Sequence, residues 1–241
     1  RLWRAGMRPI NALVDITNYV MLATGQPTHA FDSDNIQGHI IVRRAQEGEK
    51  LLLLNGKDLS LSADDLVIAD DVVALAGVMG GAKDSILPTT HKVILEVANF
   101  NAAGVRRTAL RYDNRTEASS RYEKAIDPQR CDQALDLAAE LFRQLYPEVQ
   151  FTGLVDHYPA PMACKELDVA LSWLERRLGK PLTQEDVSHK LGLLGFTTSF
   201  SGDTMHVTVP SWRSTGDVSI QADIMEEVAR MYGYENFEAA P

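Results

Sequence analysis

A short proline-containing segment divides this chain into two stretches of different architecture. Residues 159–163, PAPMA, combine two prolines with small residues and show no apolar periodicity, which is typical of a linker. Strands and helices are mixed before it, whereas strand, helix, helix, hairpin and helix follow it. The 241 residues suffice for two domains. We therefore expect an α+β protein with a mixed-sheet domain at 1–158 and a smaller domain at 164–241.

The composition indicates a globular protein from a reducing compartment. Hydrophobic residues make up 45% of the chain, and no apolar run is long enough to span a membrane. Cys131 and Cys164 form neither a disulfide framework nor a zinc motif, so a cytoplasmic location is expected. The net charge of -9 argues against a large phosphate-binding face. Because the first residue is Arg1, we interpret the chain as a piece of a longer protein.

Residues 8–32, RPINALVDITNYVMLATGQPTHAFD, predict a helix followed by a rigid turn. Pro9 suits a first helical position, Gly25 suits the helix end, and apolar residues recur at helical spacing between them. Another face of this helix carries polar side chains, at Asn11, Asp15 and Asn18. The turn after Gly25 places His29 between a proline and an aromatic residue. This arrangement is typical of a binding site, although a solvated helix face and an ordinary loop give the same pattern.

The rest of the first domain predicts strands and two further helices. The strands are expected at 39–44, 51–54, 66–69, 72–78, 92–98 and 151–158, with turns at Asn55-Gly56 and Asp70-Asp71. Asn101 caps a helix to residue 110, and Pro128 begins a helix to about residue 146. Between them, residues 111–126 are crowded with charged and hydroxyl side chains.

Glu96 is the unusual residue of an otherwise apolar strand. Alternation places Val93, Leu95 and Val97 on one face and Ile94, Glu96 and Ala98 on the other. A carboxylate there lies at a sheet edge or lines a pocket, and a buried one needs partners. The motifs GxSxG, HExxH and a Walker loop are absent from the sequence. Any catalysis is therefore expected to use a positioned water rather than a covalent intermediate.

The second domain has the element order of a winged-helix-like module. Strands are expected at 166–171, 196–200 and 205–209, and helices at 172–178, 183–194 and 218–232. Ser172 and Thr183 are the expected helix caps. The middle helix is not basic, because Glu185, Asp186 and Lys190 nearly cancel, so we do not expect this domain to bind nucleic acid alone.

Four carboxylates lie close together near the end of the chain, at Asp217, Asp223, Glu226 and Glu227. The last three are spaced i, i+3 and i+4, which places them on one helix face. Oxygen ligands of this kind suit Mg²⁺. An acidic helix start favoured by the helix dipole gives the same pattern.

Four separated blocks resemble one known family. TNYVMLATGQPTHAFD, AGVMGG, RRTALRYDNRTEASSRYEKAID and VPSWRSTGDVSIQADIMEEVARMYGYE occur in this order. They closely resemble the central part of the bacterial phenylalanyl-tRNA synthetase beta subunit, and the resemblance covers essentially the whole chain. It implies that the first domain is an editing domain and that the second is the winged-helix-like domain that follows it.

The resemblance implies hydrolysis of tyrosine wrongly esterified to tRNA(Phe). A pocket made for phenylalanine cannot strongly reject an isostere with one added hydroxyl, so a second site that hydrogen-bonds the phenol is useful. By resemblance, Glu96 recognises the tyrosine hydroxyl and His29 is a second polar anchor; these two are the candidate catalytic residues. The implied substrate-binding residues are Arg8, Thr17, Asn18, Pro27, Gly80, Thr116 and Ala118.

The same resemblance implies partners and cofactors for the parent enzyme. Asp217, Asp223, Glu226 and Glu227 match magnesium-associated carboxylates at a site shared with the alpha subunit. The expected partners are that alpha subunit, in an alpha2-beta2 heterotetramer, and tRNA(Phe). ATP is used by the whole enzyme, so this piece should not aminoacylate. The acidic net charge fits a domain that receives only the charged tRNA terminus.

Two other classes of function also fit the sequence. The chain could be an interaction module whose pocket no longer edits, in which case substitutions at His29 and Glu96 would have no catalytic effect. It could also be a regulator that binds nucleic acid through the second domain, although the lack of a basic excess argues against this. The residues do not identify a general base, so we expect substrate groups and backbone dipoles to share that work.

Overall fold

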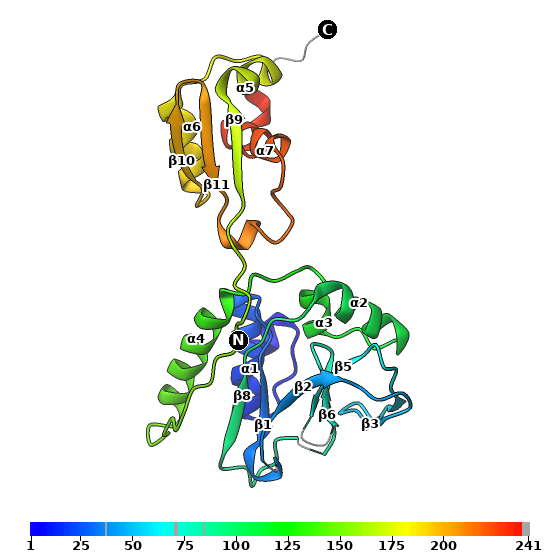
Figure 1. Ribbon diagram of the computed structural model, residues 1–241. Helices are drawn as coiled ribbons and strands as arrows, with labels where there is room; N and C mark the ends of the chain where they lie inside the picture. Colours follow the sequence, from blue (N-terminus) through cyan, green and yellow to red (C-terminus); the bar gives the residue numbers. More distant parts are fainter. Residues whose placement is uncertain (37, 70–71, 84, 238–241) are drawn as a thin grey trace. The chain divides into compact units, whose positions relative to one another are not determined.

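The structure is a computed structural model that describes residues 1–36, 38–69, 72–83 and 85–237 (Figure 1). It divides into two compact units, Arg1–Val155 and Asp156–Pro241. Each unit combines helices with small sheets, so the α+β class is confirmed. No helix in the described ranges is both long and apolar enough to cross a membrane.

The first unit contains four helices and eight strands among its described residues. The helices are α1 (Ala12–Thr24), α2 (Ala102–Arg111), α3 (Glu117–Tyr122) and α4 (Arg130–Leu145). The strands are β1 (His29–Asp32), β2 (Ile41–Arg44), β3 (Lys50–Leu52), β4 (Asp58–Ser60), β5 (Leu66–Ala69), β6 (Val72–Leu75), β7 (Met79–Gly80) and β8 (Val93–Glu96). They form a sheet of order β2-β5-β6-β7 and the pairs β1-β8 and β3-β4. Where a mixed sheet was predicted, every pairing between described strands is antiparallel.

Helix α1 starts later than the sequence predicted. The Asn11 side chain accepts a hydrogen bond from the Val14 N–H at 3.0 Å and so caps the helix, which leaves Pro9 outside it. The Asp15 carboxylate accepts from the Ile10 N–H at 2.9 Å. Two of the three predicted polar side chains therefore bind the helix's own N-terminal region. The predicted end is confirmed, because Gly25 adopts a left-handed φ of 76°.

The loop predicted after α1 is in part a strand. His29–Asp32 forms β1, which pairs with β8 so that His29 lies opposite Glu96. The prediction was wrong because the partner strand lies more than sixty residues away in the sequence, and such pairing leaves no local signal.

Strand β8 separates two hydrophobic clusters, as its alternation predicted. Val93 and Leu95 pack with buried residues of α1 and α4, whereas Ile94 packs against the core of the β2-β5-β6-β7 sheet. In Figure 1, α1 and α4 lie on one side of this strand. The same alternation directs Glu96 toward the sheet side.

Several smaller predictions have mixed outcomes. The Asn55-Gly56 turn is confirmed between β3 and β4, with a φ of 84° at Gly56. The strand predicted at 72–78 ends at Leu75, and the Asp70-Asp71 turn lies outside the described residues. Residues 151–158 form neither helix nor strand, so that prediction was wrong. Asn101 caps α2 as predicted, but α3 was not predicted.

Asp65 anchors α2 to the sheet. Its carboxylate is fully buried and accepts hydrogen bonds from the Thr108 hydroxyl at 2.8 Å and the Arg111 guanidinium at 2.6 Å. The Tyr112 hydroxyl and the Ser62 N–H complete the set. A buried carboxylate with four donors fixes the helix at a defined position.

The second unit is a three-stranded antiparallel sheet packed with helices. Its strands are β9 (Glu166–Ala170), β10 (Thr197–Ser201) and β11 (Thr204–Thr208), in the order β10-β11-β9. Its helices are α5 (Leu171–Leu178), α6 (Gln184–Leu193) and α7 (Gln221–Tyr232). The element order is the predicted one, and the winged-helix-like identity stays a prediction.

One of the two predicted caps in this unit is confirmed. The Thr183 hydroxyl accepts from the Asp186 N–H at 3.2 Å at the start of α6. Ser172 is not a cap, because α5 begins at Leu171 and the Ser172 hydroxyl instead donates to Asp203, which follows β10.

Asp65→Ala should lower the free energy of unfolding by about 3 kcal/mol, because it leaves a guanidinium and two hydroxyls without their common acceptor. Urea unfolding of the chain measures this change. Asp64→Ala is the matched control, since the Asp64 side chain is 82% exposed and should cost less than about 0.5 kcal/mol. Equal losses in both variants would contradict the anchoring role.

Candidate functional site

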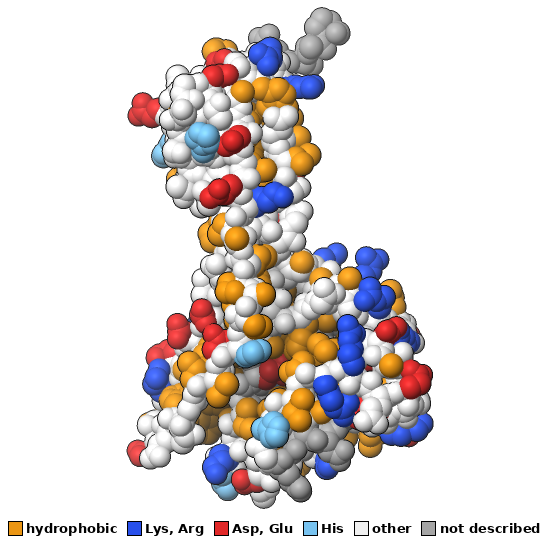
Figure 2. All heavy atoms as spheres, viewed as in Figure 1, with side chains coloured by type: hydrophobic (Ala, Val, Ile, Leu, Met, Phe, Trp, Pro, Cys, Tyr) orange, Lys and Arg blue, Asp and Glu red, His pale blue; other side chains and the backbone are white. Residues whose placement is uncertain are grey.

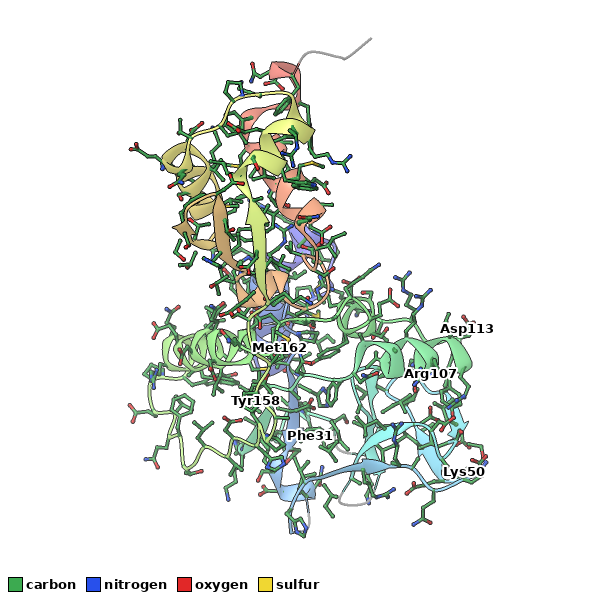
Figure 3. All side chains as sticks on the ribbon, turned by 45° about the horizontal axis from the view of Figure 1, so that its top comes forward. Phe31, Lys50, Arg107, Asp113, Tyr158 and Met162 are labelled. Carbon is green, nitrogen blue, oxygen red and sulfur yellow. The ribbon has the colours of Figure 1, made fainter. Side chains whose placement is uncertain are left out.

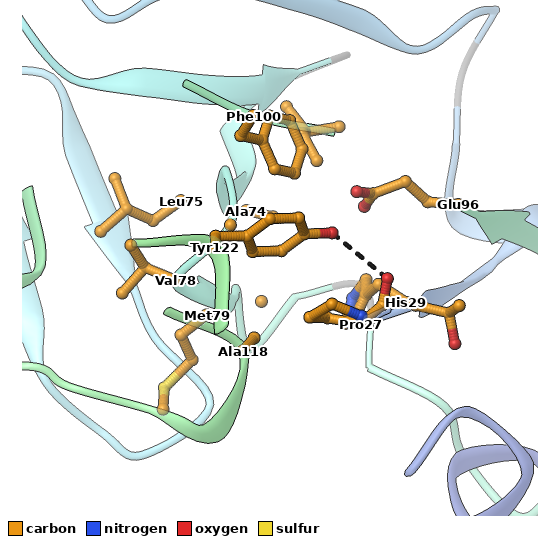
Figure 4. Close-up of a pocket in the computed structure, with 14 residues that line it drawn as sticks. Pro27, His29, Ala74, Leu75, Val78, Met79, Glu96, Phe100, Ala118 and Tyr122 are labelled. Carbon is orange, nitrogen blue, oxygen red and sulfur yellow. Dashed lines mark hydrogen bonds between the residues drawn. The ribbon is translucent and has the colours of Figure 1, made fainter. Parts of the chain in front are cut away.

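A cavity opens in the first unit between the β1-β8 pair, the β5-β6-β7 strands and α3 (Figure 4). It holds about 390 Å³ of space between the atoms that line it, and this volume includes open solvent. Its hydroxyl-bearing and ionisable lining residues are Thr28, His29, Glu96 and Tyr122. Its larger apolar lining residues are Ile68, Leu75, Val78, Met79 and Phe100.

His29 enters the cavity wall from β1. Its ring meets the Phe31 ring edge-on, with centroids 4.6 Å apart. A Cβ atom on Gly80 would lie only 2.8 Å from His29 Cε1, so the absence of a side chain at Gly80 makes room for the imidazole. Burial lowers the pKa of His29 to about 4. The imidazole is therefore neutral at pH 7 and can accept a hydrogen bond without charge.

Glu96 lies opposite His29 on β8. No hydrogen bond or ion pair joins its carboxyl group to any residue in the described ranges, although most carboxylates in such surroundings are paired. Burial raises the pKa of Glu96 to about 7. The group is therefore present in both protonation states near neutral pH, and it can accept a hydrogen bond or exchange a proton there.

Tyr122 closes the back of the cavity from α3. Its hydroxyl donates to the Pro27 carbonyl at 3.2 Å (Figure 4) and to the Ala98 carbonyl at 2.9 Å. The buried Gln26 amide nitrogen binds the same two carbonyls and the Tyr122 oxygen, while its Oε1 accepts no hydrogen bond from the described residues. Burial, and then the charge of Glu96, raises the pKa of Tyr122, so the phenol stays neutral.

The structure brings some of the predicted site residues together. Besides His29 and Glu96, the cavity is lined by Pro27, Gly80 and Ala118. Thr116 lies at the edge of the wall, where its hydroxyl donates to the Val78 carbonyl at 2.7 Å. Arg8, Thr17 and Asn18 are not among the lining residues. Arg8 is exposed, and Thr17 is buried on α1 with its hydroxyl on the Val14 carbonyl.

The sequence reasoning missed the aromatic part of the wall. Tyr122 follows Ala118 by four residues and so shares its helix face, a signal that identifies it once α3 is recognised. Phe100 precedes the cap of α2, and its ring meets that of Tyr122 edge-on at 5.1 Å. Neither position carries a polar pattern that marks a site.

Three of the four carboxylates predicted to bind Mg²⁺ bind other groups of this chain. Asp223 accepts from the Ser219 and Ile220 N–H groups and caps α7, and the Ser219 hydrogen bond is the main cause of its lowered pKa. Glu227 is buried between the guanidinium groups of Arg213 and Arg230.

Asp217 pairs with the Arg213 guanidinium as well, whereas the Glu226 side chain forms no ion pair or hydrogen bond with a described residue. No three His, Cys, Asp or Glu side chains within the described ranges gather in a way that could hold a metal ion. The carboxylates at this place therefore do not form a donor set, and we derive no step through a metal. The magnesium site stays a prediction.

Comparisons with known proteins agree with the resemblance. Residues 1–147 match the family model of the B3/4 domain, and residues 167–234 match that of the tRNA synthetase B5 domain. The phenylalanine–tRNA ligase beta subunit of Streptococcus agalactiae is 45% identical over 98% of this chain and 30% of that protein. The beta subunit of Lactobacillus johnsonii is 43% identical over 99% of this chain and 30% of that protein.

The chain thus spans about a third of the length of these relatives. Among solved structures, an N-terminal fragment of the phenylalanyl-tRNA synthetase beta subunit from Pyrococcus horikoshii aligns with 92% of this chain and 65% of that chain. The sequence identity is 14% and the TM-score is 0.48.

Gly80→Ala should displace the His29 ring, because the added Cβ would lie 2.8 Å from it. We expect a loss of about 1–3 kcal/mol in unfolding free energy and a shift of the His29 ring resonances by NMR. Gly104→Ala is the control, since its Cβ would meet only ordinary contacts on α2. A Gly80→Ala protein with unchanged His29 resonances would contradict this packing.

Glu96→Gln should stabilise the chain at high pH only. The pKa of Glu96 is about 7 in the folded state and 4.5 in the unfolded state. Between these two pH values the unfolded state is ionised and the folded state keeps its proton, so the unfolding free energy falls as the pH rises from about 4.5 to 7. The neutral amide avoids this loss. We expect the variant to gain roughly 2 kcal/mol at pH 8 and little at pH 5, measured by urea unfolding. If the variant and the wild type differ in unfolding free energy by the same amount at pH 5 and pH 8, the Glu96 carboxyl group is well solvated and this prediction is wrong.

Proposed function

Since this chain belongs to the B3/4 domain family and is related over nearly its whole length to phenylalanine–tRNA ligase beta subunits, we propose that its first domain is an editing hydrolase. Its substrate is tyrosine wrongly esterified to tRNA(Phe). The editing domain spans residues 1–158, and residues 164–241 form the winged-helix-like domain. Hydrolysis of the mischarged ester supports accurate phenylalanyl-tRNA synthesis in translation.

The unpaired Glu96 carboxyl in the wall of an otherwise apolar cavity is the observation that supports this proposal most directly. A tyrosine side chain in the cavity can donate its phenolic hydrogen to Glu96, with the neutral His29 as a second polar anchor. Phenylalanine fills the same space and leaves the carboxyl group unpaired, at a cost of about 1–3 kcal/mol. The cavity therefore discriminates in the direction opposite to a phenylalanine pocket.

The reaction is hydrolysis by a positioned water. The water adds to the ester carbonyl carbon and gives up a proton, the bond from that carbon to the ribose oxygen breaks, and the ribose oxygen takes up a proton to become a hydroxyl. Tyrosine and uncharged tRNA are the products. The described residues of the cavity wall include no serine or cysteine nucleophile, so the chain's contribution is to hold the ester and the attacking water in position. Substrate groups and backbone dipoles share the proton transfer.

Small residues leave room for the substrate. Ala118 lines the cavity on α3, one helical turn before Tyr122, and Gly80 lines it from β7. A large side chain at Ala118 would occupy the space of the tyrosine ring. Arg8, Thr17, Asn18, Pro27 and Thr116 complete the proposed substrate-binding residues.

The remaining proposals concern the parent enzyme. It pairs with a phenylalanyl-tRNA synthetase alpha subunit in an alpha2-beta2 heterotetramer, binds tRNA(Phe) and works in the cytoplasm. ATP is used by that whole enzyme for aminoacylation and not by this chain. A magnesium site at Asp217, Asp223, Glu226 and Glu227 would need ligands and a rearrangement that the alpha subunit provides.

Deacylation of tyrosyl-tRNA(Phe) by the parent synthetase tests the proposal. We expect Glu96→Ala and Ala118→Trp each to reduce tyrosine clearance at least tenfold, because one removes the phenol acceptor and the other fills the cavity. Aminoacylation with phenylalanine should be unchanged. Ala23→Trp, on the exposed part of α1, is the control for an added indole. Unchanged clearance in both site variants would mean that this chain is a scaffold and that editing occurs elsewhere.

A further inference from the structure

The first unit has a second cavity, and its lining includes two arginines, whereas the lining of the first cavity includes Glu96. The second cavity also holds about 390 Å³ of space and is lined by Arg44 of β2 and Arg107 of α2. Phe100 lines this cavity and the first one as well. The Phe100 side chain is therefore a wall that the cavity at Arg107 shares with the proposed ester site.

Helix α2 carries two arginines that form no ion pair with a described carboxylate. Its apolar face is buried, whereas Arg106 and Arg107 are exposed and form no ion pair or hydrogen bond with a side chain in the described ranges. Arg111, one turn later, is different because it binds Asp65. Lys and Arg side chains gather over this helix in Figure 2, and Figure 3 labels Arg107 on it.

The basic excess is local. Residues 101–124 contain six Lys or Arg and three Asp or Glu, whereas residues 130–148 contain two and four. Arg106 and Arg107 are neighbours in the sequence and both are exposed, so their charges repel each other, and no carboxylate in the described ranges pairs with either of them. An anionic ligand compensates these charges.

We propose that Arg106 and Arg107, with Arg44 across the second cavity, bind phosphate groups of the RNA whose 3′ ester enters the first cavity; this rests on the proposed function. Guanidinium groups match phosphate oxygens in a bidentate manner. The acid in this cavity lining, Asp64, lies 3.6 Å from Arg111 and so is partly neutralised. An aminoacyl-RNA end carries a phosphate close to its ester, and a free amino acid does not.

Salt-dependent binding of an acceptor-stem RNA minihelix to the 241-residue chain tests the proposal. The variant is Arg106→Gln with Arg107→Gln. We expect the slope of log K against log salt to fall in magnitude by about 2, because each lost phosphate contact removes about one unit. Lys50→Gln with Lys92→Gln is the control, since both lysines are exposed, form no ion pair or side-chain hydrogen bond with a described residue and lie outside α2 (Figure 3 labels Lys50). Equal changes in both double variants would overturn the proposal.

Hydrolysis assays separate this inference from the proposed function. With a tyrosyl minihelix, the arginine variant should show a KM raised at least tenfold and an unchanged kcat. With 3′-tyrosyl adenosine, which lacks phosphate, it should match the wild type. A loss of hydrolysis with both esters would overturn phosphate binding as the role of these arginines. If the wild-type chain hydrolyses neither ester, the proposed function fails, and the salt slopes still decide whether α2 binds phosphate.

Discussion

The antiparallel pairing of β1 with β8 is the constraint on which the candidate site depends. It places His29 opposite Glu96 and fixes both backbones through the ladder. The other face of β8 packs on α1 and α4 through Val93 and Leu95. Because the ladder and this packing hold the strand, the two polar side chains need no hydrogen bonds of their own to stay in place. They are therefore available to a ligand.

An unpaired carboxyl group in such a wall costs stability that the rest of the unit must supply. The pKa of Glu96, raised to about 7 by burial, expresses that cost. Asp65 shows the alternative within the same unit, since its buried carboxylate has four donors and anchors α2. The Asp65 carboxylate has a structural role, because its own chain supplies all four hydrogen-bond donors. The Glu96 carboxyl group has no donor among the described residues, so it can accept a hydrogen bond from a ligand. The contrast between these two acids is a stronger indicator of function than burial alone.

Local signals in the sequence predicted the parts of the fold that depend on neighbouring residues. The cap at Asn101, the left-handed end at Gly25 and the alternation of β8 all follow from such signals. The β1 strand was missed because it forms against β8, which is distant in the chain. Helix α3 was missed although Thr116 caps it locally, because its six residues are too few to show a helical period. Tyr122 was missed with α3. Glu96 and His29 could be singled out as isolated polar residues, but only the fold shows that they face each other.

Net charge is a poor guide to nucleic-acid binding when opposite charges lie on different elements. The total of -9 argued against a phosphate-binding face, yet ion pairing decides which cations remain available. Arg111 and Arg213 are engaged by carboxylates, while Arg106 and Arg107 are exposed and Arg107 lines a cavity. At physiological salt, charges that lie farther apart than the Debye length are largely screened. Acidic groups elsewhere on the chain therefore repel an RNA bound at α2 only weakly. Local, unpaired arginines can therefore position an RNA end that the chain as a whole does not attract.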